Sequence, residues 1–201
     1  IHEDSQILVV SKPAGLLSVP GRGIIYTDCL LKRVQVVFPD ALLIHRLDRD
    51  TSGLMVFGLT RHAQRHLSKQ FEARLVKKAY VARVLGSVTQ KEGLINLPLI
   101  VDWPNRPRQK ICHETGKVAL TGWKLLKSEQ QESRLRLFPK TGRSHQLRVH
   151  CLALGHPILG DSLYCTKNIA RVDRMMLHSE ELRFSHPESG KGVKFRSKVP
   201  F

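Results

Sequence analysis

The sequence predicts an α+β fold with a largely antiparallel or mixed central sheet that is flanked by helices and loops. Segments with strand patterning outnumber those with helical periodicity. Most consecutive strand segments are joined by connections of hairpin length, which favours antiparallel neighbours. The chain has 201 residues, of which 41% are hydrophobic, and a chain of this size can bury a substantial core.

Strand and helix signals alternate closely near the start of the chain. β-branched residues at 7–10 predict a short strand, and the Lys-Pro-Ala-Gly sequence at 12–15 is a turn signal that ends it. A loop that contains proline and glycine is expected at 16–23. Asp28 is then expected to cap a helix that runs to Val37.

The most informative segment is a charged connection at 45–51 between two apolar runs. The runs at 41–44 and 54–59 each predict a buried strand. Thr60 is expected to cap the next helix, over about 61–74, whose apolar residues are spaced four apart. The same helix carries a basic face made of Arg61, Arg65, Lys69 and Arg74.

The rest of the chain is predicted to be mostly strands. One more helix is expected to begin at Thr141 and to run to Leu154, with Gly155 at its C-terminal end. A basic loop that contains prolines is expected at 102–110. The strands are predicted at 78–84, 94–101, 118–126, 134–138, 175–177, 182–184 and 193–195.

The chain is strongly basic. It has 33 Lys and Arg residues against 17 Asp and Glu residues, and a formal net charge of +16. A surface of this charge favours a polyanionic partner, most commonly nucleic acid. The excess is spread along the chain and is not confined to a tail. A basic protein whose charges are merely solvated is the alternative at this point.

Composition disfavours several classes of protein. No apolar run approaches the roughly 18 residues of a membrane span, and the chain starts without the basic region of a signal peptide. The first residue is Ile1 and not Met, so we expect that preceding residues of the natural protein are missing. Four cysteines without a CxxC pair indicate a reduced, cytoplasmic setting. We expect no nucleotide cofactor and no metal site, since neither pattern is convincing.

Asp48 is the candidate catalytic carboxylate. It lies in the charged segment with arginines on both sides, where it could equally well cap a turn together with Thr51 and Ser52. A second polar cluster at 140–146 contains Arg143. An arginine held against Asp48 would keep that carboxylate ionised and oriented, as a nucleophile or a base requires.

The charged segment and four further motifs resemble the RluA family of pseudouridine synthases. Residues 45–54, His-Arg-Leu-Asp-Arg-Asp-Thr-Ser-Gly-Leu, resemble the signature of that family. The segments 97–100 and 102–107 resemble the RluA branch, which is associated with both large-subunit rRNA and tRNA. Ser179 departs from the family pattern, which usually has Ala there. The other motifs follow in the family's order and, with the signature, cover nearly the whole chain: 12–15, 78–82, 142–161 and 177–187.

The resemblance implies a pseudouridine synthase catalytic fold with an active-site cleft across the sheet. Such enzymes convert uridine in RNA to pseudouridine without a cofactor: the glycosidic bond is broken, the uracil turns, and C5 is joined to the ribose. By resemblance Asp48 is the essential carboxylate, and whether it attacks the sugar or the base, or removes a ribose proton, stays open. Tyr80 is expected to lie against the uracil ring, and Arg143 is expected to pair with Asp48.

The resemblance also implies residues that bind the RNA. The target base must leave its stack, and Arg46 stands two residues before Asp48, where its side chain can fill the vacated space. Leu177 is expected to form an apolar wall of the uracil pocket, with plain core packing as its alternative. Further substrate contacts, mainly to phosphates, are expected from Lys12, Arg61, Arg65, Arg106 and Arg108.

Residues 1–201 are therefore expected to form a single catalytic domain without a separate S4-like RNA-binding domain. The predicted function is site-specific isomerisation of uridine in a structured rRNA or tRNA stem-loop. We expect a cytoplasmic monomer with RNA as its partner and no association with membranes. Two alternatives stay open: a non-catalytic RNA-binding or ribosome-assembly protein on this fold, and a base-excision glycosylase that releases the free base.

Overall fold

The computed structural model describes residues 1–21, 27–165 and 172–201. The chain divides into two compact units. The first unit consists of Ile1–Lys78 and His178–Pro200, and the second consists of Ala79–Leu177 with Phe201. The predicted loop at 16–23 lies partly outside the described residues. Each unit is built around strands and carries at least one helix, which confirms the α+β class.

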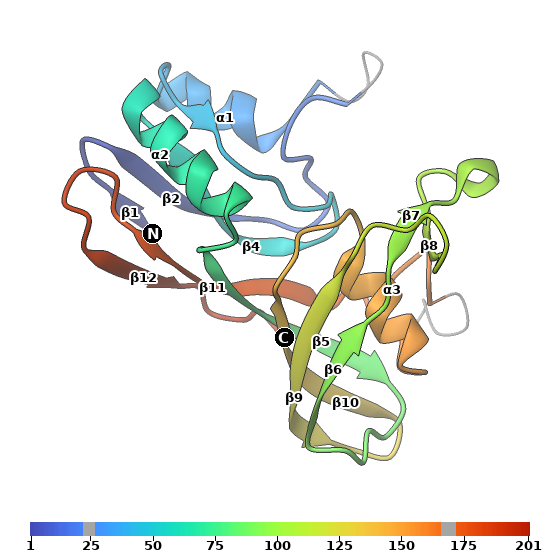
Figure 1. Ribbon diagram of the computed structural model, residues 1–201. Helices are drawn as coiled ribbons and strands as arrows, with labels where there is room; N and C mark the ends of the chain where they lie inside the picture. The colour runs from blue at the N-terminus through green and yellow to red at the C-terminus, as the bar shows by residue number, and fades with distance from the viewer. Residues whose placement is uncertain (22–26, 166–171) are drawn as a thin grey trace. The chain divides into compact units, whose positions relative to one another are not determined.

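The first unit contains a mixed sheet, which can be followed in Figure 1. All seven residues of β4 are buried, and one edge of β4 pairs antiparallel with β2. On its other edge, β4 pairs parallel with β11 at its start and antiparallel with β3 at its end. The outer strands β1 and β12 pair antiparallel with β2 and β11. The strands are β1 (His2–Glu3), β2 (Ile7–Lys12), β3 (Leu42–Leu43), β4 (Ser52–Gly58), β11 (Leu177–Ser185) and β12 (Gly192–Arg196).

The helix α2 (Arg61–Glu72) covers this sheet in the first unit (Figure 1). The Thr60 hydroxyl accepts a hydrogen bond from the backbone N–H of Ala63, which confirms the predicted N-cap. Ala63 and Leu67 face inward, and both are fully buried. They belong to a hydrophobic cluster that also contains Ile7, Val9, Leu54, Val56, Val76, Leu182 and Phe184.

The other predicted cap in this unit is wrong. The helix α1 (Leu30–Val37) has Cys29 at its N-cap, without a side-chain cap hydrogen bond. The Asp28 carboxylate instead accepts two hydrogen bonds from the Arg33 guanidinium, at 2.8 and 2.6 Å. A bidentate arginine competes directly with the backbone for a carboxylate, and here the arginine is the partner.

The second unit contains an antiparallel sheet in the order β5-β10-β9-β6. Its strands are β5 (Lys77–Leu85), β6 (Glu92–Asn96), β9 (Leu120–Ser128) and β10 (Glu132–Pro139). A separate hairpin pairs β7 (Leu99–Val101) with β8 (Gln109–Ile111), and a 3-10 turn, Trp103–Asn105, lies between them. The single strand predicted at 94–101 is therefore two strands, because Pro98 lacks the N–H that a sheet ladder needs.

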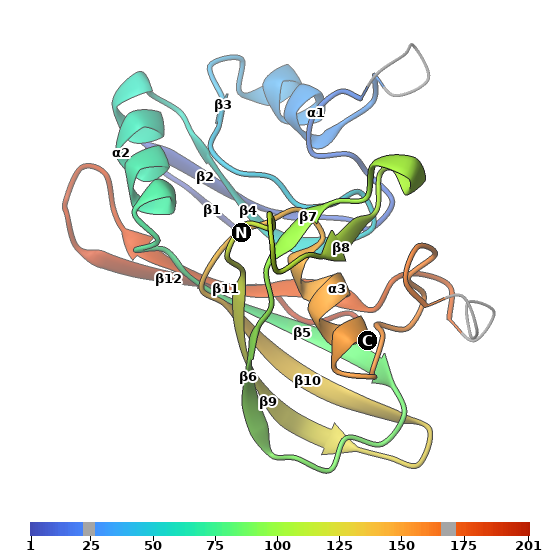
Figure 2. The same ribbon diagram turned by 45° about the vertical axis from the view of Figure 1, so that its right-hand side comes forward.

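The helix α3 (Gln146–Ala153) begins five residues later than predicted. His145 precedes it in the left-handed conformation, with φ of 53°. Residues 141–145 are not helical. The Gln146 side chain holds them by accepting hydrogen bonds from the Thr141 hydroxyl and the Arg143 N–H. Figure 2 shows α3 beside the β7–β8 hairpin. Leu99, Ala119, Val149 and Tyr164 form the hydrophobic cluster between them.

The segments predicted at 175–177 and 182–184 are not two separate strands. Residues 177–185 form the single strand β11, and Met175 and Met176 precede it as buried residues outside any strand. His178 and Ser179 are polar but 2% and 0% exposed, and this buried polar pair interrupts the apolar pattern by which the strand could be found.

All four cysteines are free thiols. Cys29, Cys151 and Cys165 are buried, whereas Cys112, directly after β8, is partly exposed. Burial raises the pKa of the Cys151 thiol to about 12. Among the described residues, no helix is both long enough and apolar enough to cross a membrane.

Candidate functional site

The charged segment is a loop that connects β3 to β4 in the first unit. It runs back alongside β4, since the two strands are antiparallel and Leu43 lies opposite Phe57. Ser18 fixes the middle of this loop. Its hydroxyl donates to the Leu47 carbonyl at 2.7 Å and accepts from the Leu47 N–H at 3.1 Å. Leu47 is buried, and the residues on either side of it, Arg46 and Asp48, are more exposed.

Lys12 holds the loop at Arg49, the second residue after Leu47. Its ammonium donates to the Arg49 carbonyl at 2.8 Å, and to the carbonyls of Pro13 and Leu16 at 2.9 and 2.6 Å. The side chain is 1% exposed. Three carbonyl partners match the three N–H donors of an ammonium group. Lys12, predicted to bind the substrate, is therefore buried inside the protein, and its contacts favour a supporting role.

A buried contact with β11 fixes the end of the loop. A hydrogen bond of 2.7 Å joins the Ser52 hydroxyl to Nδ1 of His178, and both residues are buried. The next residue, Gly53, has φ of +109° and pairs with Ser179. A Cβ atom at Gly53 would lie 2.3 Å from the Ser179 carbonyl oxygen, so a side chain cannot be placed there.

His45 fixes the start of the loop. Its Nε2 accepts a hydrogen bond of 3.1 Å from the Val56 N–H, and its ring stacks on Phe71 with the centroids 4.5 Å apart. Burial and then the charge of Lys78 lower the pKa of His45 to about 3. The ring is therefore neutral at physiological pH, which agrees with its role as an acceptor.

The loop presents Arg46 and Asp48 from this framework. Arg46 is exposed and Asp48 is half-buried. The Asp48 carbonyl accepts from the Thr51 N–H at 3.2 Å, which closes a turn. Thr51 and Ser52 are buried at the end of that turn. A turn is therefore present at Asp48, and the backbone carbonyl of Asp48 is its acceptor.

In the second unit, Gln146 organises the loop that carries Arg143. Its side-chain oxygen accepts from the Thr141 hydroxyl at 2.6 Å and from the Arg143 N–H at 3.0 Å. Its amide group donates to the Leu120 carbonyl and the Thr121 hydroxyl. The Arg143 Nε donates to the Val118 carbonyl at 3.0 Å. Both the backbone and the guanidinium of Arg143 are thereby oriented.

Tyr80 and Leu177 also belong to the second unit. Tyr80 lies on β5 opposite Leu137 of β10, and its side chain is 8% exposed. Leu177, the first residue of β11, is 3% exposed. Their burial agrees with roles in a pocket, and it agrees equally with packing.

The remaining predicted residues lie in two basic groups. Arg61 and Arg65 are exposed on α2, four residues apart and on the side opposite Ala63 and Leu67. Arg106 and Arg108 lie between β7 and β8, where Arg106 stacks on Trp103 with its guanidinium carbon 3.9 Å from the ring centroid.

The structure thus brings Lys12, Arg46 and Asp48 together on one loop framework of the first unit. Sequence reasoning missed the supports of that framework, namely Ser18 and the Ser52–His178 pair. Their partners are 29 and 126 residues away along the chain. No local pattern marks such contacts, since they arise only when the strands pair.

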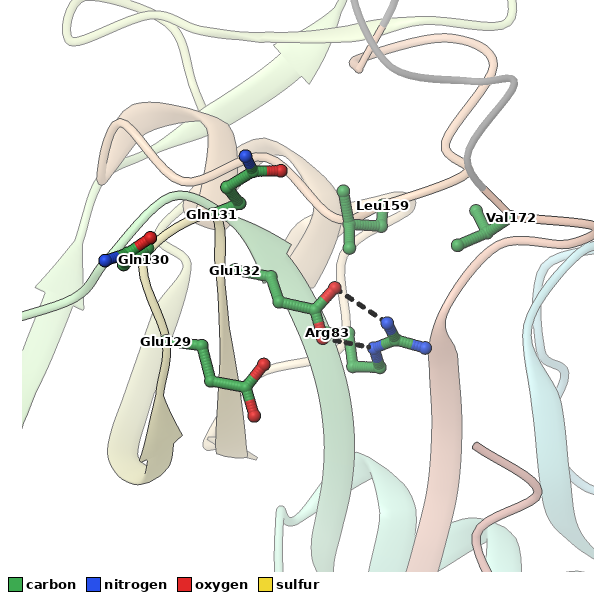
Figure 3. Close-up of a pocket in the computed structure, with 7 residues that line it drawn as sticks. All are labelled: Arg83, Glu129, Gln130, Gln131, Glu132, Leu159 and Val172. Carbon is green, nitrogen blue, oxygen red and sulfur yellow. Dashed lines mark hydrogen bonds and ion pairs between the residues drawn. The ribbon is translucent and has the colours of Figure 1, made fainter.

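The second unit also contains a cavity of about 660 Å³. It is lined by Arg83, Glu129, Gln130, Gln131, Glu132, Leu159 and Val172. Figure 3 shows the Arg83 guanidinium and the Glu132 carboxylate facing each other, joined at 3.0 and 2.7 Å. None of the predicted site residues lines this cavity. Two carboxylates against one already paired arginine do not suit a polyanion.

Comparisons with known proteins show the family to which this chain belongs. The family model described as RNA pseudouridylate synthase matches residues 6–153. The Yersinia pestis protein named Dual-specificity RNA pseudouridine synthase RluA is 51% identical, over all of this chain and 98% of the relative. The Escherichia coli K12 protein of the same name is 49% identical, over all of this chain and 93% of the relative.

Solved structures show the same likeness. Human RNA Pseudouridylate Synthase Domain Containing 1 is 31% identical with a TM-score of 0.85, and the match covers all of this chain and 83% of that one. Human RNA Pseudouridylate Synthase Domain Containing 4 has a TM-score of 0.81 at 24% identity, over 99% of this chain and 87% of that one, and supports the fold. With the family model spanning most of the chain and relatives near 50% identity over its full length, the chain belongs to the RNA pseudouridylate synthase family.

Proposed function

We propose that the protein isomerises specific uridines to pseudouridine in structured RNA, and that both ribosomal and transfer RNA are substrates. The observation that carries this proposal is the loop at 45–51, which five hydrogen bonds hold along its length and at its end, so that Arg46 and Asp48 are presented together. Dual substrates are supported by the names of the relatives that share about half of its residues.

Asp48 is the essential carboxylate in this proposal. The reaction breaks the bond between uracil N1 and the ribose and joins C5 to the same ribose carbon. C5 gives up its proton and N1 takes one up, so the product is an isomer of uridine. A carboxylate that is held in place by its own backbone can act on the sugar or the base without reorganisation. Support comes from the turn that Asp48 closes with Thr51 and from the support of Arg49 by Lys12.

Tyr80 and Arg143 take further roles at the same uridine. We assign to Tyr80 a place against the uracil ring, where it helps to remove the C5 proton. Arg143 would pair with the Asp48 carboxylate and keep it ionised. Its contact with Val118 uses one of the five guanidinium N–H groups, and arginine can pair bidentately with the others. Leu177 would supply an apolar wall to the pocket.

RNA binding is assigned to Arg46 and to the two basic groups. Arg46 would enter the stack when the target base leaves it. Arg61, Arg65, Arg106 and Arg108 would contact phosphates, which position the RNA but do not read its sequence. Lys12 would act on substrate indirectly, by supporting the Asp48 loop.

We propose one catalytic domain over residues 1–201, because the family match includes parts of both units. The four free thiols support a reducing, cytoplasmic setting. A monomeric state and a reaction without a cofactor stay predictions.

The test is tritium release from RNA that is labelled at uracil C5. Wild-type protein should release the label, and Asp48→Asn should reduce release by on the order of 10³-fold or more, as loss of an essential catalytic group does. The amide nearly matches the carboxylate in shape, so the variant should unfold at nearly the same temperature as the wild type. An active Asp48→Asn protein would contradict the assignment.

Analysis of the products separates the two alternatives. Chromatography of digested RNA should show pseudouridine and no free uracil. Free uracil would indicate a glycosylase, and RNA binding without any change of the RNA would indicate a non-catalytic protein.

A further inference from the structure

Trp103 is an exposed aromatic residue on a basic hairpin. Its side chain is 62% exposed, whereas Trp123, the other tryptophan of the chain, is 2% exposed. The Arg106 guanidinium covers one face of the Trp103 ring, 3.9 Å from its centroid. Since so much of the side chain is still exposed, the opposite face of the indole is open to solvent.

The backbone holds this pair in place. The turn is closed by hydrogen bonds from Asp102 N–H to the Arg108 carbonyl at 2.9 Å and from Asn105 N–H to the Asp102 carbonyl at 3.0 Å. The Asn105 amide also donates to the Asp102 carboxylate at 2.9 Å. An aromatic ring that is ordered before binding loses little entropy when a ligand stacks on it.

Tyr164 connects the hairpin to the loop of Arg143 within the same unit. Its hydroxyl accepts from the Gln109 N–H at 2.7 Å and is hydrogen-bonded to Nδ1 of His145 at 2.9 Å. His145 is two residues from Arg143 along the chain. A second connection runs through Lys117, which exchanges two backbone hydrogen bonds with Leu99 of β7. The residue after Lys117 is Val118, whose carbonyl accepts from Arg143. A group bound at the turn is thus held by elements that also hold Arg143.

The charge of the turn suits one kind of ligand. The turn and β8 carry three cationic side chains, those of Arg106, Arg108 and Lys110. The Asp102 carboxylate is a nearby negative charge, and it lies 3.8 Å from the Lys110 ammonium. An open aromatic face beside arginines matches an unpaired nucleotide, since the base can stack on the indole while its phosphates lie near the cations. A paired base within a helix has no free face to offer.

We propose that Trp103, backed by Arg106, is a stacking platform for an unpaired base of the RNA substrate other than the target uridine. This inference rests on the proposed function, because it takes RNA as the substrate. The platform would select RNAs whose loop places a second unpaired base at a fixed distance from the reacting one.

The first test is tryptophan fluorescence. It is measured in the Asp48→Asn background, so that the RNA is not modified during titration with a stem-loop that has an unpaired loop. Stacking on a base should quench the emission, and Trp103→Phe should remove that quenching, because only the buried Trp123 then emits. Quenching that persists in Trp103→Phe, or no quenching at all, would overturn the platform.

The second test is affinity. Trp103→Ala should weaken binding of the stem-loop by about 5- to 100-fold, as loss of one stacked base does, with little change for a fully paired duplex of the same stem. Trp103→Phe should keep most of the wild-type affinity. Arg106→Lys should weaken binding although it keeps the positive charge, because lysine lacks the planar guanidinium that stacks on the indole. Unchanged affinity of Trp103→Ala, or an equal loss on both RNAs, would contradict the proposal.

The two proposals fail in different ways. If the wild-type protein releases no tritium but the quenching and the loop-selective loss are observed, the proposed function fails and the platform stands. If tritium release is normal and Trp103→Ala binds both RNAs like the wild type, the platform fails alone.

Discussion

At the scale of single residues, Arg46 and Asp48 stand on either side of a residue that the protein buries. Leu47 is 7% exposed, and both its backbone N–H and its carbonyl are hydrogen-bonded to the Ser18 hydroxyl. Successive side chains of an extended segment point to opposite sides. Burial of Leu47 between them agrees with the greater exposure of Arg46 and Asp48.

Arg46→Ala should lower turnover by roughly 10- to 100-fold, because an extruded base is then no longer replaced in the stack, at a cost of a few kcal/mol. Tritium release under single-turnover conditions measures the effect. Arg49→Ala is the matched control, since the Arg49 side chain is exposed and pairs with Asp50 at 3.0 Å, and it should lose less. Wild-type turnover in Arg46→Ala, with matching melting curves, would rule out insertion.

His45 should make stability depend on pH. Its pKa is about 3 in the folded protein, below the value of about 6.5 of an unperturbed histidine. The unfolded chain therefore takes up the proton first, and stability falls as the pH drops from about 6.5 toward 3, by up to ~1.4 kcal/mol per unit. His45→Gln keeps an acceptor for the Val56 N–H and does not titrate. Urea unfolding at pH 7, 6 and 5 should show a smaller loss for this variant, and parallel losses would contradict the assignment.

At the scale of elements, the close pairing of β4 with β11 depends on Gly53. Gly53→Ala should lower the free energy of unfolding by on the order of 3 kcal/mol, because it adds both a strained φ and a clash with backbone atoms. Gly190→Ala is the control, since Gly190 also has a positive φ, +67°, but has open space where the Cβ would lie. It should cost only about 1 kcal/mol. Equal losses in chemical denaturation would show that the contact with Ser179 is unimportant.

Elements were predictable where a local signal had no rival. Thr60 caps α2 as its position indicates, whereas Asp28 has Arg33 five residues away and binds it instead. The predicted start of α3 is too early because Gln146, the first residue of the helix, accepts hydrogen bonds from the Thr141 hydroxyl and the Arg143 N–H and holds them outside the helix. Such side-chain competition depends on three-dimensional contacts, so residue patterns do not reveal it.

At the scale of the whole molecule, the net charge of +16 should make RNA binding strongly dependent on salt. If four to six phosphates are neutralised, the logarithm of affinity should fall against the logarithm of salt with a slope of about −3 to −5. Replacing Arg61 and Arg65 together by Ala should make that slope shallower by about 1 to 2. A flat dependence in the wild type would argue against phosphate contacts by the basic surface.

The fold class and the family were accessible from sequence because they rest on many residues at once. Five motifs in order predicted the family. The motifs at 12–15 and 45–54 lie in the first unit, the motif at 142–161 lies in the second, and those at 78–82 and 177–187 contribute residues to both. The role of Lys12 was less accessible. A lysine in a motif suggests a phosphate ligand. Only the structure reveals the three carbonyls that surround the Lys12 ammonium.

The free thiols described above have a practical consequence for spectroscopy. Cys112 is partly exposed, and hydrogen bonds, first from the Thr115 side chain, lower its pKa, whereas the other three cysteines are buried. The thiolate is the reactive form, so a maleimide dye should attach to Cys112 well before the others. The dye would then sit one residue beyond β8, on the hairpin that carries Trp103. The natural sequence thus supplies a single labelling position from which energy transfer to a fluorescent RNA can be followed without engineering a cysteine.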